Sequence, residues 1–330
     1  MADLSTTFAG LKLKNPVIIG SSGLTDSVEN IKSLERNGAS AVVLKSLFEE
    51  EIIREMEASM SKIQSESYLY PETLEFYEDQ KETEESTVKY LELIKNLKQE
   101  VDIPVIASIN CITSSQWTYF PELIESAGAD ALELNIFIFP LDASRKGDEN
   151  EKIYFDIIKE VTKQVNIPVI AKISYYFSDL GKMIQDLSET EISGMVLFNR
   201  YYNPDFDIEN FEITSGGVLS HPSDIYQSLR WIGIMANRVN CDLAATTGIH
   251  DGKAIIKQLL AGASAVQIAS AIYNHGPECI KPMLEEITSW MEKKKFNSIS
   301  DFKGKMGQDK LDNPAAFQRI QFMKYFRSYR

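Results

Sequence analysis

Ala127-Gly-Ala-Asp-Ala-Leu-Glu-Leu134 and Ala261-Gly-Ala-Ser-Ala-Val-Gln-Ile268 are two copies of one unit, in which a helical pattern ends at glycine and a short apolar run follows. Residues 37–44 and 192–198 contain close variants. A glycine just past a helix supplies a left-handed C-cap, and short apolar runs without alternation are typical of strands buried on both faces. The unit therefore predicts a helix followed by a strand of a parallel sheet.

A second repeated unit places a proline at the entrance of an apolar run. It occurs as Val101-Asp-Ile-Pro-Val-Ile-Ala-Ser-Ile109 and as Val165-Asn-Ile-Pro-Val-Ile-Ala-Lys-Ile173. Proline is accepted at the start of a strand, where no ladder donor is needed. With two further apolar runs, the sequence predicts eight strands, at residues 16–20, 40–46, 103–109, 130–136, 168–174, 193–199, 241–246 and 264–269.

Helical patterns lie between these strands, at residues 28–36, 86–98, 119–126, 150–164, 179–190, 223–238 and 253–260. Strands that alternate with helices of this length imply right-handed parallel crossovers, and eight such strands close a barrel. We therefore predict an α/β fold, a single-domain (β/α)8 TIM barrel. A doubly wound open sheet is the alternative, and the lack of a Gly-x-Gly-x-x-Gly segment after an early strand disfavours it.

Two connections are longer than the usual loop of about 4–6 residues. They run from Ser46 to Glu85 and from Arg200 to His221, and because both follow strands we expect them over the carboxyl-terminal mouth of the barrel. We predict that residues 1–306 form the barrel. Residues 307–330 carry aromatic side chains at helical spacing, and we expect them to form a helical extension packed on the barrel.

The composition favours small-molecule or protein partners. The 330 residues carry 34 basic and 48 acidic side chains, a net charge of −14, which disfavours binding to nucleic acid or to an anionic membrane surface. No apolar stretch approaches the roughly 18 residues that cross a bilayer, and the first residues do not resemble a signal peptide, so we expect a cytoplasmic protein. The three cysteines are widely spaced, which indicates neither a disulfide framework nor a metal site.

Polar residues gather where the predicted strands end, and in a barrel these ends face the substrate. They include Lys45, Lys172, Asn135 and Asn199. Lysines at this place are costly to desolvate unless an anion meets them. A carboxylate substrate or the anionic reduced ring of a flavin would be such an anion. The alternative is that a lysine pairs inside the barrel with Glu133 or Asp130.

The ends of the last two strands predict an anion site. Thr247-Gly248-Ile-His-Asp-Gly252 leads into a helix, and Ala269-Ser270 ends the eighth strand. Loop amides and a helix N-terminus bind phosphate at this place in many barrels. The pair Gly216-Gly217 can add backbone amides without a side-chain clash. A phosphate-bearing cofactor is one interpretation, and glycines that only serve turns are the other.

Segments spread over the whole predicted barrel carry a family resemblance. They are Thr6–Pro16, Ser21-Ser22-Gly23, Leu44-Lys45-Ser46, Glu133-Leu-Asn135, Ala171-Lys172, Gly248-Ile249, Val266-Gln-Ile268 and Ser298–Lys305. In these segments the chain resembles class 1 dihydroorotate dehydrogenases, over about residues 4–306. Members of that family are FMN-containing barrels that oxidise dihydroorotate to orotate in pyrimidine biosynthesis. The resemblance therefore implies an FMN-dependent oxidoreductase that acts on a CH–CH bond, and a homodimer.

The resemblance also implies roles for individual residues. Lys172 would stabilise the negative charge of the reduced flavin, and Lys45 would approach both the flavin and the substrate. The substrate side would use Lys45, Asn135 and Asn199. The implied FMN contacts are Ser21, Ser22, Lys45, Ser46, Asn135, Lys172, Phe198, Gly217, Gly248, Ala269 and Ser270.

The chain departs from the family pattern on the substrate side. The family's catalytic base, a Cys in class 1, lies three residues after the Asn of Glu-Leu-Asn, where this chain has Ile138. The family's following Pro-Asn is replaced by Phe139-Pro140, and Arg200 stands where a Ser is usual. Nearby positions are aromatic, which predicts a rewritten pocket: Phe137, Phe139, Tyr175, Tyr176, Tyr201 and Tyr202. Substitute proton carriers would be Cys111, Ser174 or one of these tyrosines.

Three functions remain open at this point. The first is a flavin oxidoreductase that acts on dihydroorotate with a relocated base. The second is a flavin-binding relative that acts on a different ring or enone, or has lost catalysis, and Ile138 and Pro140 favour it. The third is an aldolase or lyase in which Lys172 forms a Schiff base.

Overall fold

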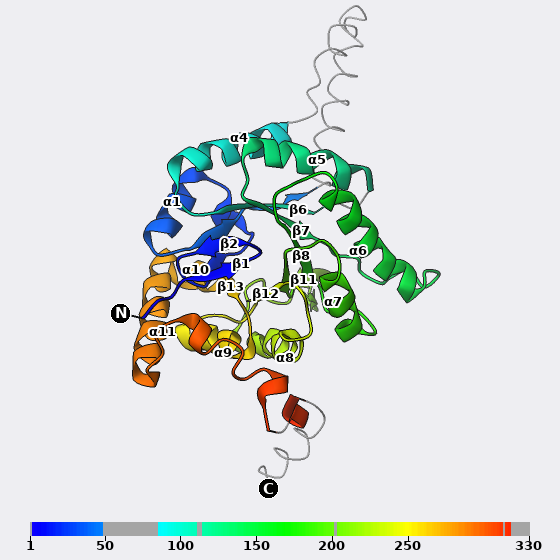
Figure 1. The fold of residues 1–330 in the computed structure, drawn as a ribbon. Coiled ribbons are helices and arrows are strands. Elements are labelled where there is room, and N and C mark those ends of the chain that lie inside the picture. Colours follow the sequence, from blue (N-terminus) through cyan, green and yellow to red (C-terminus); the bar gives the residue numbers. More distant parts are fainter. Residues whose placement is uncertain (1, 49–84, 111–113, 201–202, 313, 318–330) are drawn as a thin grey trace, which may run out of the picture.

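The apolar runs form eight parallel strands that close into a barrel (Figure 1). The computed structural model describes residues 2–48, 85–110, 114–200, 203–312 and 314–317. The barrel strands pair in the order β3–β4–β6–β7–β8–β9–β12–β13, and β13 pairs with β3 to complete the ring. Their bounds are β3 Val17–Ile19, β4 Ala41–Val43, β6 Val105–Asn110, β7 Ala131–Asn135, β8 Val169–Ile173, β9 Gly194–Leu197, β12 Asp242–Thr246 and β13 Ala265–Ile268. The predicted (β/α)8 barrel is confirmed.

Helices surround the barrel, and all seven predicted helices are present (Figure 1). Gly38, Gly128 and Gly262, which follow three of these helices, have φ angles of 110°, 99° and 122°. These are the left-handed positions that the repeated unit predicted. The bounds are α1 Val28–Arg36, α4 Glu85–Glu100, α5 Ser114–Ala127, α6 Gly147–Thr162, α7 Leu180–Ser188, α8 Ile225–Met235, α9 Gly252–Ala261, α10 Ser270–His275 and α11 Ile280–Lys294.

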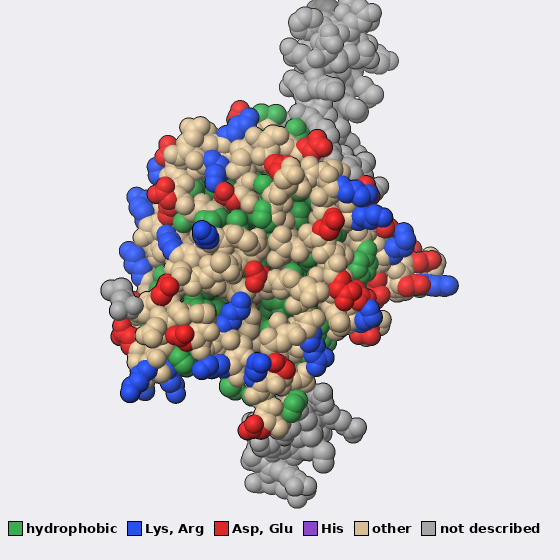
Figure 2. Space-filling model, viewed as in Figure 1, with side chains coloured by type: hydrophobic (Ala, Val, Ile, Leu, Met, Phe, Trp, Pro, Cys, Tyr) green, Lys and Arg blue, Asp and Glu red, His purple; other side chains and the backbone are tan. Residues whose placement is uncertain are grey.

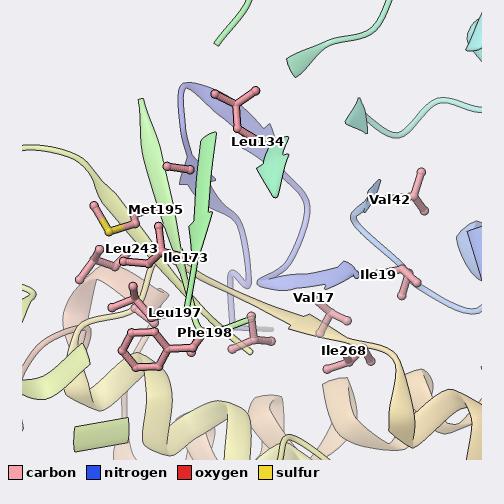
Figure 3. Packing of buried hydrophobic residues seen from close by; sticks show 14 of the residues in the cluster. Val17, Ile19, Val42, Leu134, Ile173, Met195, Leu197, Phe198, Leu243 and Ile268 are labelled. Carbon is pink, nitrogen blue, oxygen red and sulfur yellow. The ribbon is translucent and has the colours of Figure 1, made fainter. Parts of the chain in front are cut away.

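Alternate residues of each strand serve two separate cores. Val17 and Ile19 of β3 belong to the core between the strands and the helices, as do Leu134 of β7 and Ile268 of β13 (Figure 3). Ile18, between them, belongs to the core inside the barrel. Because side chains alternate along a strand, one apolar run fills both layers. This explains why the strand sequences show no polar alternation.

A hairpin that the sequence analysis did not predict closes the amino-terminal end of the barrel. Its strands are β1 Thr6–Phe8 and β2 Leu11–Leu13. Phe8 is fully buried and packs with the residues inside the barrel. The backbone N–H of Ala9 donates to Asp242 Oδ2 at 3.0 Å, at the first residue of β12. The hairpin thus completes the inner core at the amino-terminal end of the strands.

Gly194→Ala is expected to destabilise the protein by about 1–3 kcal/mol, because the barrel has no room for a side chain beside this hairpin. An ideal Cβ on Gly194 would lie 3.1 Å from Ala9 Cβ and from two ring carbons of Phe8. Urea unfolding would measure the loss. Gly147→Ala is the control, since no described atom lies within 4 Å of a Cβ added at this first residue of α6. Equal urea midpoints for the two variants would contradict the close packing.

The two long connections are described to different extents. Residues 49–84 of the first lie outside the described part. The second contains an exposed antiparallel hairpin, β10 Pro204–Asp207 and β11 Glu212–Ser215. After it, residues 216–221 lead to the start of α8 through a short 3-10 helix, Pro222–Asp224.

The predicted extension over residues 307–330 is described only at its start. Two short 3-10 helices, Gln308–Lys310 and Pro314–Phe317, follow the barrel. Arg238 Nη2, just beyond α8, donates to Gln308 Oε1 at 2.8 Å, and Asn237 Nδ2 donates to Asp309 Oδ1 at 2.6 Å. Residues 318–330 lie outside the described part, so the helical extension stays a prediction.

The surface carries charges of both signs. Figure 2 shows basic and acidic side chains interspersed over the face that it presents. Among the residues that the structure describes, no helix combines the length and apolar character needed to span a membrane. The same residues contain no group of three or more His, Cys, Asp or Glu side chains placed to hold a metal ion.

Candidate active site at the carboxyl ends of the strands

A cavity of about 640 Å³ lies at the carboxyl ends of the barrel strands, within the size range of small-molecule sites. Eleven of the predicted site residues line it: Ser21, Ser22, Lys45, Ser46, Asn135, Lys172, Phe198, Asn199, Gly248, Ala269 and Ser270. Gly217 is exposed and is not among the lining residues, but the next three residues, Val218, Leu219 and Ser220, are. The structure therefore brings nearly the whole predicted set together.

Lys172 is held at the cavity floor by two buried side chains. Its Nζ lies 3.4 Å from Glu133 Oε1 and donates to Gln267 Oε1 at 3.0 Å. Gln267 Nε2 in turn donates to Glu133 Oε2 at 2.5 Å. The exposed fraction is 7% for Lys172 and 0% for Glu133. The pairing with Glu133 that the sequence left open is thus present, and Lys172 still lines the cavity.

This Lys172–Glu133–Gln267 triad depends on strands far apart in the sequence. Lys172 lies on β8, Glu133 on the neighbouring strand β7, and Gln267 on β13, across the barrel. A buried ion pair is favourable only when its remaining hydrogen-bonding capacity is satisfied, and Gln267 bonds to both charged partners. The arrangement keeps a cation in place at a site where an anion can approach it.

Serine hydroxyls form a chain along the first three strand ends. Ser21 Oγ accepts from the backbone N–H of Ser46 at 2.9 Å and lies 3.1 Å from Ser46 Oγ. Ser46 Oγ lies 2.8 Å from Ser108 Oγ. Tyr90 of α4 supports this chain from behind, because its hydroxyl donates to the Ser108 carbonyl and accepts from the Ser108 N–H. Burial raises the pKa of Tyr90 well above its usual range.

Two asparagines meet on the opposite side of the cavity. Asn199 Nδ2 donates to Asn135 Oδ1, and the Asn199 backbone N–H donates to the Ile173 carbonyl at 2.8 Å. Both side chains are partly exposed to the cavity. Amide groups of this kind offer paired donors and acceptors to a ring amide or a carboxylate. Lys45 lies at the cavity edge with an exposed side chain.

The predicted anion site is a tight turn after β12. Thr247 and Gly248 have φ angles of 73° and 76°, in the left-handed region. The Gly248 N–H donates to Ser220 Oγ at 3.3 Å, and Ser270 Oγ accepts from the Ser220 N–H at 3.0 Å. His250 Nε2 lies 3.0 Å from Ser220 Oγ, and burial lowers the pKa of His250, which favours its neutral form. Ser220 therefore ties this turn to the start of α10.

Arg200 supports the segment around Gly217 and Val218, which lies beside the cavity. Its guanidinium donates to the carbonyls of Val218 at 2.5 Å and Gly217 at 3.2 Å. Its Nε also lies 3.8 Å from Asp224 Oδ2. Gly217 thus contributes to the site by receiving this bond, and the residues after it line the cavity.

Ile138, which stands at the family's base position, turns away from the cavity. Its backbone N–H donates to Tyr154 Oη at 3.2 Å, and its side chain packs against the outer core. Ser174 is not among the lining residues either. It is buried, and its hydroxyl accepts from the Tyr176 N–H at 3.3 Å. Tyr175 and Tyr176 are exposed and are not among the lining residues. The remaining suggested carriers, Cys111, Tyr201 and Tyr202, lie outside the described residues.

Sequence reasoning missed Ser220, Tyr273 and Phe48 among the lining residues. A signal existed for two of them. Tyr273 lies three residues after Ser270 on α10, hence on the same helix face. Ser220 directly precedes His221-Pro222, a typical helix-start sequence, where a hydroxyl meets the adjacent turn.

Fold and site together define a (β/α)8-barrel protein with a ligand cavity at the carboxyl ends of its strands, where enzymes of this fold carry their active sites. The sequence model of one family, described as dihydroorotate dehydrogenase, matches residues 3–291. The chain therefore belongs to the dihydroorotate dehydrogenase family, a family of oxidoreductases.

Curated relatives match the chain over nearly its whole length. A Thermoplasma volcanium protein is 27% identical over 322 residues, which cover 92% of this chain and 98% of the relative. A Methanocaldococcus jannaschii protein is 25% identical, with 88% and 94% covered, and one from Endomicrobium trichonymphae is 25% identical, with 94% and 99% covered. Each of these three is named dihydroorotate dehydrogenase B (NAD(+)), catalytic subunit.

Proposed function

We propose that the protein is an FMN-dependent oxidoreductase that oxidises a CH–CH bond of a small ring substrate, dihydroorotate or a relative of it. The observation that carries the proposal is the buried cation at the cavity floor. Lys172 is held by Glu133 and Gln267 and yet lines the cavity. A cation so placed favours a ligand on which negative charge develops during the reaction.

The donor set of the cavity suits FMN. Hydroxyl groups of Ser21, Ser22 and Ser46 line one side, and the turn at Thr247 and Gly248, whose Gly248 N–H donates to Ser220 Oγ, lines another. At Gly248 a Cβ would lie 2.1 Å from the backbone N of Ile225, so this turn lies directly against the start of α8. We infer that the turn holds the phosphate and that Lys172 lies beside the flavin ring.

The residues of the chain would then divide the work. FMN, when bound, would accept the hydride that leaves the substrate. Lys172 would stabilise the negative charge that the ring gains, and its contacts to Glu133 and Gln267 keep its ammonium oriented. Asn135 and Asn199 would orient the substrate by hydrogen bonds to its ring amides or carboxylate. Lys45, at the cavity edge, would contact both ligands.

Ile138 favours a second candidate, in which the substrate is another ring or an enone, or catalysis has lapsed. An isoleucine cannot accept a proton, and its side chain packs on the core rather than lining the cavity. The family reaction therefore needs a proton acceptor at another place in this chain. Loss of the base does not remove the reason for a flavin at Lys172, so both candidates share the cofactor.

We expect the purified protein to be yellow, and its visible spectrum tests the proposal. Bleaching when dihydroorotate is added without oxygen would identify the family reaction and a relocated base. A yellow protein that does not bleach would support the second candidate. A colourless protein that takes up no added FMN would refute both, and borohydride trapping of a carbonyl substrate on Lys172 would then test the Schiff-base alternative.

We further propose a cytoplasmic homodimer that passes its electrons to a partner. The relatives are named as catalytic subunits of an NAD(+) form, and a catalytic subunit implies another subunit in the assembly. Sedimentation of the purified chain measures whether it forms a dimer. Co-purification from its native cells measures whether a second chain accompanies it.

A further inference from the structure

Four aromatic side chains form a connected group beside the candidate active site. Phe137 and Phe139 follow β7, and Tyr175 and Tyr176 follow the adjacent strand β8. Ring centroids are 5.6 Å apart for Phe137 and Phe139, 5.2 Å for Phe139 and Tyr176, and 4.8 Å for Tyr175 and Tyr176. We call these four residues the aromatic shelf.

The aromatic shelf is open to solvent although it is apolar. The exposed fraction is 46% for Phe139, 41% for Tyr175 and 36% for Tyr176. Covering large aromatic rings lowers the free energy, and contiguous exposed apolar patches mark binding sites. A second cavity of about 450 Å³ adjoins the shelf and is lined by Ile138, Pro140 and Tyr154 as well as by the two shelf tyrosines.

The shelf adjoins the candidate active site through one ring contact. The Tyr175 ring meets the Phe198 ring edge-on, with centroids 5.7 Å apart, and Phe198 lines the main cavity. Asn135, which also lines that cavity, lies two residues before Phe137. A ligand that extended from the main cavity past Phe198 would therefore meet the aromatic rings of the shelf.

We propose that the aromatic shelf is a substrate subsite, and that the substrate carries a planar apolar group attached to the polar, anionic ring or carboxylate that the cavity floor recognises. The proposal rests on the proposed function and narrows it to a larger and less polar substrate than dihydroorotate. The polar end is assigned by Lys172, Asn135 and Asn199, and the apolar end by the four aromatic residues. Ile138 and Pro140 fit this assignment, because they supply apolar walls next to the shelf.

Two carboxylic acids that differ only in apolar area provide the test. Calorimetric titration of the purified protein should show that 2-naphthoate binds roughly tenfold more tightly than benzoate, since the second ring would cover the shelf. Phe139→Ala and Tyr176→Ala should each remove most of this difference, whereas Phe206→Ala, an exposed aromatic residue on β10, should keep it. Tyr176→Phe, which retains the ring, should also keep it.

Equal affinity for the two acids, or an equal effect of the shelf variants and Phe206→Ala, would overturn the proposal. Concentration-dependent self-association that Phe139→Ala abolishes, without any preference for 2-naphthoate, would instead assign the shelf to a contact between chains. The visible spectrum of the same samples reports on FMN separately. A colourless protein that takes up no added FMN but still prefers 2-naphthoate would refute the proposed function and leave the subsite standing. A yellow protein without the preference would refute the subsite and leave the proposed function standing.

Discussion

Lys172→Met is expected to lower the free energy of unfolding by about 3–5 kcal/mol, because it leaves the Glu133 carboxylate buried without its cation. Glu133 is fully buried and, among the described residues, would keep the Gln267 amide as its hydrogen-bond partner. Removal of one member of a buried ion pair costs more than the pair contributes, since the remaining charge stays desolvated. Urea unfolding followed by circular dichroism measures the effect.

Two further variants make this result specific to the buried pair. Adding Glu133→Gln to Lys172→Met should restore a large part of the lost stability, because the unpaired charge is then removed as well. Lys98→Met is the matched surface control: Lys98 Nζ lies 2.6 Å from Asp130 Oδ2, but both side chains are partly exposed. Exposed pairs contribute about 0–1 kcal/mol. A loss no larger in Lys172→Met than in Lys98→Met would show that water reaches Glu133.

Gly248→Ala is expected to weaken FMN binding by about a hundredfold, or about 2.7 kcal/mol, and to destabilise the fold. The added Cβ would lie 2.1 Å from the Ile225 backbone N and 2.7 Å from the Asp224 carbonyl carbon. Neither is the flexible end of a side chain, so the turn and the start of α8 must separate. Their separation would also break the bond from Gly248 N–H to Ser220 Oγ.

Thr247→Gly is the control for this turn. Thr247 has a φ angle of 73°, where glycine is free of the strain that a β-branched residue carries. We expect FMN affinity and stability to change little in this variant, by less than about 1 kcal/mol. FMN titration and thermal unfolding measure both properties. If Gly248→Ala bound FMN as well as Thr247→Gly does, the turn would have no part in holding the cofactor.

The barrel was predictable because each of its strands is buried on both faces. Apolar runs such as Val169–Ile173 show no alternation of polar and apolar residues, which would indicate an antiparallel sheet with one exposed face. Glycines such as Gly128 mark the ends of helices. Once the strands are placed, their carboxyl ends must share one mouth, whatever their order in the chain. For this reason the polar residues at the strand ends could be gathered into one site without any coordinates.

Contacts between distant strands were less predictable. The possible pairing of Lys172 with Glu133 was visible because β7 and β8 are consecutive barrel strands, but the bridge through Gln267 crosses the barrel and depends on how the strands are staggered. The hairpin β1–β2 was missed because its strands have three residues each. Its turn, Ala9-Gly10 with φ angles of 50° and 80°, left only a weak signal.

The same hairpin limits how ligands reach the candidate active site. Phe8, Ala9 and Leu13 seal the lower end of the barrel in the described part of the chain, so the site described above is reached from the opposite end. For the proposed reaction, the substrate, the product and the electron acceptor must then all use the same opening of the cavity. They would have to bind one after another, and an acceptor too large to enter the cavity would have to receive its electrons at the cavity opening.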